Sequence, residues 1–159
     1  MNRNKKEVEL IGYTHYTMRP KKKHSDETWT KFVSDCIDVK NNLPDDVVLG
    51  DGYGEKPDPI FDNREVFFNG MHEDAHETFQ LKKAASSGDF CKTARKPYDL
   101  MVCACLLLYK HHFPYVQISS DGNLDDWREA IALVVKTCPK TKTDLTTLLL
   151  ENDLGWLKR

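Results

Sequence analysis

The feature that most constrains the fold is the segment Leu100–Leu108, in which every side chain is apolar. A helix that is apolar on all sides must be covered on all sides by the rest of the protein. Pro97 suits the first turn of such a helix and Pro114 ends it, because proline lacks the N–H that a helix interior needs. The segment is far shorter than the ~20 apolar residues of a membrane span. The sequence therefore predicts a buried central helix and no membrane partner.

Two further segments have the apolar spacing of helices that pack one face on a core. Ser25 is a suitable N-cap for the first and Asn123 for the second. Short runs rich in β-branched and aromatic residues predict strands between them. The apolar positions are Trp29, Phe32, Val33, Cys36 and Ile37 in the first helix and Trp127, Ala130, Ile131, Val134 and Val135 in the second; strands are expected at Glu7–Met18, Val47–Leu49, Glu65–Phe68, His76–Leu81 and Tyr115–Ser119, and a last helix at Asp144–Glu151. This order predicts one α+β domain over residues 1–159, with a mixed β-sheet of about four to five strands and about three to four packed helices.

The cysteines and the N-terminus indicate a cytoplasmic protein. The chain has 5 cysteines without a CxxC pair, and Cys103 and Cys105 lie inside the apolar helix, so we expect reduced core thiols. The basic N-terminus leads into no hydrophobic signal region. The formal net charge of −2 argues against a dedicated nucleic-acid partner. The basic run Arg19–Lys23 could contact nucleic acid, but such a run is more often a solvated turn.

The most distinctive polar segment is the decapeptide Phe90–Asp99, which follows a predicted loop at Ala85–Gly88 and leads into the apolar helix. Free N–H groups at a helix N-terminus favour anions, so basic side chains there suggest a receptor for negative charge. An anionic small molecule such as a nucleotide would suit this place, and so would an acidic face of a host protein. The candidate ligand-binding residues are Lys92, Thr93, Arg95, Lys96, Tyr98 and Asp99. Alternatively, Thr93 and Asp99 cap the helix while the basic side chains are solvated.

Two His-x-Thr tripeptides offer a different function. His15 with Thr17, and His76 with Thr78, each place an imidazole and a hydroxyl on one face of a strand. Two such pairs could surround a phosphate as general acid, general base and hydrogen-bond donors. The pattern resembles the two-histidine phosphoesterase superfamily, which implies metal-independent opening of phosphodiesters. The second tripeptide departs from that family because Glu77 stands where an apolar residue is expected.

The sequence gives no metal site that we would assign. His72–His76 has the letters of the H-E-x-x-H zinc motif. It is very polar, follows an Asn-Gly turn and has no evident third ligand. We therefore expect no metal and no cofactor, and the sequence leaves open both the oligomeric state and whether the protein is an enzyme.

Several segments together resemble a family of small accessory proteins of tailed bacteriophages. They are Gly12–Thr17, Phe67–Gly70, His76–Phe79, Phe90–Asp99 and Ile118–Gly122 with Trp127. The resemblance implies the cytoplasm of an infected bacterial host, with a role in host takeover or in countering host defences. A structural or assembly protein of the virion is a further alternative. The function expected from the sequence is thus an accessory protein that binds an anion or a host protein through Phe90–Asp99.

Overall fold

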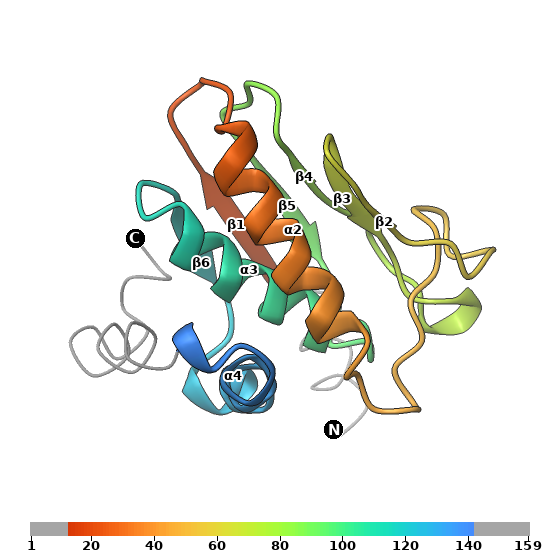
Figure 1. Cartoon of the computed structure of the whole chain (residues 1–159). Coiled ribbons are helices and arrows are strands. Elements are labelled where there is room, and N and C mark those ends of the chain that lie inside the picture. The colour runs from red at the N-terminus through yellow and green to blue at the C-terminus, as the bar shows by residue number, and fades with distance from the viewer. Residues whose placement is uncertain (1–12, 142–159) are drawn as a thin grey trace.

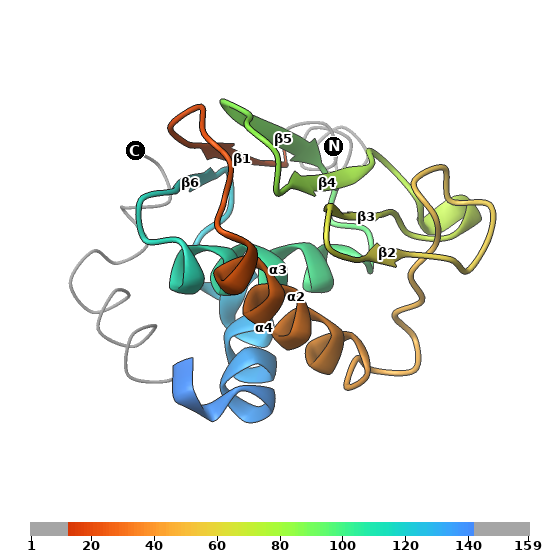
Figure 2. The same ribbon diagram turned by 45° about the horizontal axis from the view of Figure 1, so that its top comes forward.

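Strands form one layer of this protein and helices the other, as Figure 1 and Figure 2 show for the computed structural model, which describes residues 13–141. The strands are β1 (Thr14–Met18), β2 (Ile60–Phe61), β3 (Glu65–Phe68), β4 (Phe79–Lys82), β5 (Gly88–Lys92) and β6 (Gln117–Ser120); the helices are α2 (Asp26–Lys40), α3 (Asp99–His112) and α4 (Leu124–Thr137), with 3₁₀ turns η1 (His72–Asp74) and η2 (Pro139–Thr141). The α+β class expected from the sequence is confirmed.

The strands form two three-stranded sheets instead of the single mixed sheet that we expected. Their orders are β5-β1-β6 and β2-β3-β4, and every pairing within residues 13–141 is antiparallel. The two sheets meet edge to edge just before β4 begins. There the Glu77 N–H donates to the Lys92 carbonyl at 3.2 Å. Figure 2 shows β4 beside β5 at this junction. The chain thus places β1 next to both β5 and β6, its partners from far along the sequence.

Helix α3 occupies the centre of the core, as its apolar composition predicts. Its residues from Met101 to Tyr109 are all buried. It packs against α2 and α4 on one side and the β1 sheet on the other. Helix α2 contributes the buried side chains of Trp29 and Phe32 to the same core. Because α3 is held from both sides, side chains at its first turn have fixed positions.

The predicted helix starts are confirmed by their hydrogen bonds. The Ser25 side chain accepts from the Thr28 N–H, which begins α2. Asn123 and Asp126 form a reciprocal capping box at the start of α4. Both arrangements satisfy N–H groups that a helix leaves unpaired at its first turn. The expected apolar faces therefore turn toward the core.

Several local predictions differ from the structure. Val47–Leu49 forms no strand, and the predicted loop before Phe90 contributes the first residue of β5. Gly88 allows this pairing, since a Cβ there would lie 2.0 Å from the Thr17 carbonyl oxygen and its φ is +141°. Helix α3 begins at Asp99, two residues after Pro97. The first part of Glu7–Met18 and the helix expected at Asp144–Glu151 lie outside the described residues.

The cysteines lie in the core, as the sequence predicts. All 5 cysteines are free and buried. Within residues 13–141, none of the helices combines the length and the apolar character that crossing a bilayer would take.

Candidate functional site

The decapeptide divides into a strand end, a tight turn and a helix start. Lys92 is the last residue of β5, and Asp99 is the first of α3. Between them, Ala94 and Arg95 both have left-handed backbone angles, with φ of 52° and 57°. Consecutive left-handed residues reverse the chain sharply. This turn brings the Asp99 carboxylate over His15 of β1, a contact that the sequence does not reveal.

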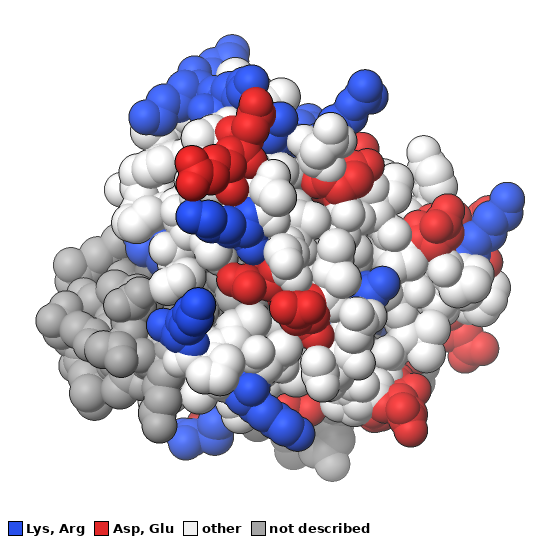
Figure 3. Space-filling view, in the orientation of Figure 1, with Lys and Arg blue, Asp and Glu red and all other residues white. Residues whose placement is uncertain are grey.

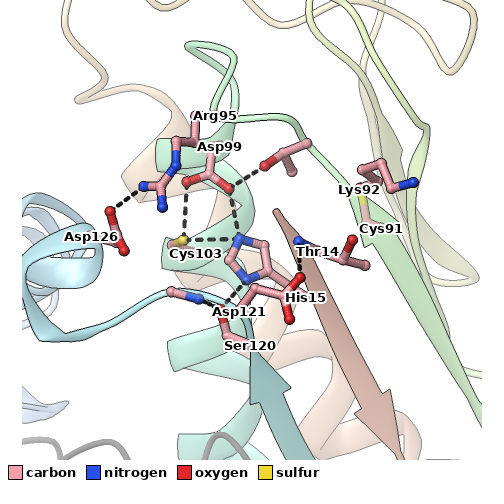
Figure 4. Close-up of polar contacts among 12 residues, drawn as sticks. Thr14, His15, Cys91, Lys92, Arg95, Asp99, Cys103, Ser120, Asp121 and Asp126 are labelled. Atoms are coloured by element: carbon pink, nitrogen blue, oxygen red, sulfur yellow. Dashed lines mark hydrogen bonds and ion pairs between the residues drawn. The ribbon is translucent and has the colours of Figure 1, made fainter. Parts of the chain in front are cut away.

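His15, Asp99 and Cys103 form a compact cluster of three different side-chain types (Figure 4). Nε2 of His15 lies 2.7 Å from Oδ1 of Asp99. Sγ of Cys103 lies 3.6 Å from the same nitrogen and 3.5 Å from Oδ2 of Asp99. All three ligand atoms are within 4.8 Å of one another. Asp99 and Cys103 are one helical turn apart on α3, so a single helix face presents both to β1.

Two hydroxyl groups fix the orientation of this cluster. Nδ1 of His15 lies 2.7 Å from Oγ of Ser120, which faces it directly across the β1–β6 pairing. Thr93 donates from Oγ1 to Oδ1 of Asp99 at 2.7 Å. Ser120 also accepts the Gly122 N–H at 2.9 Å. Because Ser120 is 5% exposed and faces His15 across the strand pairing, it positions the imidazole.

The cluster is poorly suited to thiol catalysis on its own. The Cys103 side chain is buried, and burial together with the adjacent Asp99 carboxylate raises the pKa of its thiol well above the usual range. A nucleophilic cysteine needs the opposite shift, toward the thiolate. A bound cation would remove the disadvantage, since coordination deprotonates a thiol outright.

A pocket of about 190 Å³ reaches the cluster from the side of Asp99. Arg95 borders it, ion-paired with Asp126 and with its guanidinium 4.0 Å from the centre of the Tyr13 ring. The lining carries the two cations Arg95 and Lys96 against the carboxylates of Asp99, Asp126 and Glu129. Asp99 is the member of the cluster that opens onto this space, with a side chain 15% exposed.

The residues predicted to bind an anion do not form one basic surface. Lys92 is absent from the pocket lining, and Figure 4 shows it on the β5 side, away from Arg95. Tyr98 is buried and donates to the Glu77 carbonyl at 2.6 Å. Thr93 and Asp99, expected as helix caps or ligand contacts, bond to each other through their side chains. Of the six candidates, Arg95, Lys96 and Asp99 share the pocket.

The two His-x-Thr pairs lie in different surroundings. His15 and Thr17 point inward from β1, where Thr17 exchanges hydrogen bonds with the Asp89 backbone. His76 is exposed in the segment before β4, and Thr78 donates to the Gly52 carbonyl at 2.5 Å. Within residues 13–141, no hydrogen bond, ion pair or ring contact joins one pair to the other. The geometry therefore gives the phosphodiesterase hypothesis no shared cleft.

The H-E-x-x-H segment does not form the α-helix that zinc binding by this motif requires. His72–Asp74 is a single 3₁₀ turn, and His72 and His76 are both exposed. A histidine and a carboxylate do come together elsewhere, where β1 and α3 contribute them. Their spacing along the chain exceeds 80 residues for His15 and Asp99, so no local motif marks the cluster. The one local signal was the pair Asp99 and Cys103 at helical spacing.

No protein-family model, curated protein or solved structure matches this chain. The resemblance to bacteriophage accessory proteins therefore stays a prediction, and the site must be interpreted from its own geometry.

Proposed function

We propose that this protein binds a Zn²⁺ ion through His15, Asp99 and Cys103 and acts through that ion on a small anionic ligand. The observation that carries the proposal is the convergence of a nitrogen, a carboxylate and a sulfur ligand within 4.8 Å. Ligand atoms of a tetrahedral zinc site, with bonds of about 2.0–2.3 Å, lie roughly 3.3–3.6 Å apart. The two separations that involve Sγ of Cys103, 3.6 and 3.5 Å, already match this spacing.

The hydrogen bonds around the cluster support the same interpretation. A histidine that binds a metal through one ring nitrogen usually donates from the other, and this donation fixes the ring. Nδ1 of His15 is paired with Ser120 while Nε2 faces the other two ligands. Thr93 holds the Asp99 carboxylate in the same way. The arrangement thus provides inner ligands and the outer partners that orient them.

Three protein ligands leave a fourth position for water or a bound molecule, which is typical of catalytic zinc sites. Of the three ligands, Asp99 lines the neighbouring pocket, whose lining also includes Arg95 and Lys96. Without a metal, carboxylates outnumber cations in the lining, so an anion has no advantage there. A divalent cation, together with the Cys103 thiolate, cancels this excess of negative charge and offers an anion a direct coordination position. The proposed ligand is therefore a phosphate ester or carboxylate that binds only to the metal-loaded protein.

Metal titration tests the proposal directly. We expect the purified chain to bind one Zn²⁺, and Co²⁺ in its place to show the charge-transfer absorption of a thiolate ligand. The Cys103→Ser change should weaken Zn²⁺ binding by more than the roughly 10–100-fold cost of losing an outer partner. Cys105→Ser is the matched control, because Cys105 is equally buried on the same helix and stands outside the cluster. Equal loss in both variants, or no thiolate signal with Co²⁺, would refute the site.

Ser120→Ala gives a second prediction. Removing this hydroxyl leaves all three metal ligands in place but frees the His15 ring at Nδ1. We expect Zn²⁺ affinity to fall by about 10–100-fold, measured by competition with a chelating dye. Ser119→Ala on the neighbouring, outward-facing position should leave the affinity unchanged.

A further inference from the structure

The outer face of the β5-β1-β6 sheet carries large apolar side chains in solvent. Strand β1 alternates, with His15 and Thr17 inside and Tyr16 and Met18 outside. Tyr16 is 41% exposed, Met18 62% and Phe90 67%. Phe90 of β5 is the direct partner of Tyr16 in the sheet register. Two aromatic rings therefore stand side by side on the outer face of this sheet. Figure 2 shows the helix layer on the opposite side of the strands.

Basic side chains flank this aromatic pair at both ends. Lys92 lies on the same face of β5, two residues from Phe90 and opposite Thr14. Beyond Met18 the chain enters the turn that holds Lys21, Lys22 and Lys23, all exposed. Figure 3 shows basic side chains gathered at this end of the molecule, over the turn between β1 and α2. The face is thus an aromatic strip with a group of lysines beyond its Met18 end, while at the other end Lys92 lies near the carboxylates of Asp121 and Glu77.

A hollow of about 420 Å³ adjoins the strip, bordered by Tyr16, Ser119, Ser120 and Asp121. Ser119 is the partner of Tyr16 on the β6 side, so a polar side chain lies next to the ring on this edge. From Thr14 to Met18 a strand advances roughly 13 Å at ~3.3 Å per residue. That length suits a few unpaired nucleotides.

We propose that this face, defined by Tyr16, Met18, Phe90 and Lys92, binds single-stranded nucleic acid. Exposed aromatic rings stack on bases without regard to sequence, and lysines that flank them neutralise the backbone phosphates. Lysines next to exposed aromatic rings favour a polyanionic partner. The net charge of −2 argues against a protein dedicated to nucleic acid, but the run Lys21–Lys23 supplies local positive charge beside the strip. The proposal is independent of the metal site, which lies on the inner side of β1.

Fluorescence anisotropy with labelled oligothymidine and oligouridine tests this proposal. We expect the full chain to bind either strand at low salt and to release it as salt rises, since released counterions drive such binding. Tyr16→Ala and Phe90→Ala should each weaken binding about ten-fold, the effect of losing one stacked base. Tyr53→Ala is the matched control, since Tyr53 is 79% exposed but lies in the acidic loop. Circular dichroism checks that the variants fold. We expect them to fold because all three substituted side chains are exposed.

Each contrary result is informative. Absence of binding by the wild-type chain at low salt overturns the proposal. An equal effect of Tyr53→Ala and Phe90→Ala also overturns it, because stacking would then not be local to this face. A concentration-dependent dimer that Phe90→Ala dissociates would show that a second copy of the chain covers the strip, and would overturn it as well. Loss of the salt dependence in a Lys21→Glu, Lys22→Glu, Lys23→Glu variant supports it.

Discussion

Replacing Arg19 with methionine is expected to lower the free energy of unfolding by about 3 kcal/mol. Arg19 belongs to the basic run that the sequence describes as a solvated turn, yet it is 8% exposed. Its guanidinium donates to the carbonyls of Lys82, Lys22 and Ala84 at 2.7, 2.5 and 3.2 Å. Methionine fills a similar volume but leaves these carbonyls without donors. Each buried acceptor left without a partner costs roughly 1–3 kcal/mol, and water reaches some of them.

Lys21→Met is the control for this prediction. Lys21 is exposed in the same turn, and substitutions of this kind usually change stability by less than ~0.5 kcal/mol. Urea denaturation followed by tryptophan fluorescence measures both variants, because Trp29 and Trp127 are buried. If the two variants have the same midpoint, Arg19 does not tie the β1–α2 turn to the β4–β5 loop. A large effect at Arg19 alone would show that only one member of the basic run is structural.

A second large effect is a loss of stability when the pH falls from about 6.5 to about 4. His24 is fully buried, and burial together with the charges of Arg19 and Lys22 lowers its pKa to about 4. Its ring nitrogens are bonded to the hydroxyls of Tyr109 and Tyr115. The unfolded chain takes up a proton near pH 6.5 while the folded protein does not, so acid favours unfolding. The full contribution is about 3 kcal/mol, and it is complete once the pH is below about 4.

His24→Gln isolates this contribution. Glutamine can donate and accept hydrogen bonds but does not titrate. We expect urea midpoints of the wild type to fall more steeply than those of the variant between neutral pH and pH 4. Carboxylates that titrate in the same range affect both proteins equally, so they cancel in the difference. Parallel pH profiles would contradict the assignment of His24 as a neutral buried base.

The core of the fold could be predicted from the sequence because its signals are local. The uninterrupted apolar run of α3 allowed no other place than the interior. The caps Ser25 and Asn123 marked helix starts within one residue. Strand β5 was missed because its pairing depends on Gly88 lying against Thr17, a contact between distant segments. Sheet partners of this kind are decided by tertiary packing, which no short window of sequence contains.

The candidate site was only partly predictable, for the same reason. The sequence pointed to the segment Phe90–Asp99, in which Asp99 and the turn before it border a pocket. It grouped Lys92 and Tyr98 with that pocket, but neither lines it, because Lys92 lies on β5 and Tyr98 is bonded to the Glu77 carbonyl. The sequence pattern pairs His15 with His76, whereas the contacts of His15 are with Asp99, Cys103 and Ser120. Spacing along the sequence can reveal metal ligands that lie on one helix or strand. It does not reveal a set of ligands that two separate elements contribute.

The enclosed position of α3 has a consequence for how the chain folds during synthesis. Its cover comes from α2, which precedes it, and from α4, which follows. Strand β1 also cannot complete its pairing until β6, which lies more than 90 residues later in the chain, has been synthesised. A nascent chain that has not yet extended past about residue 137 therefore presents the α3 segment to solvent or to a chaperone. We expect ribosome-bound fragments ending before α4 to be captured by chaperones, and slightly longer fragments to be released from them.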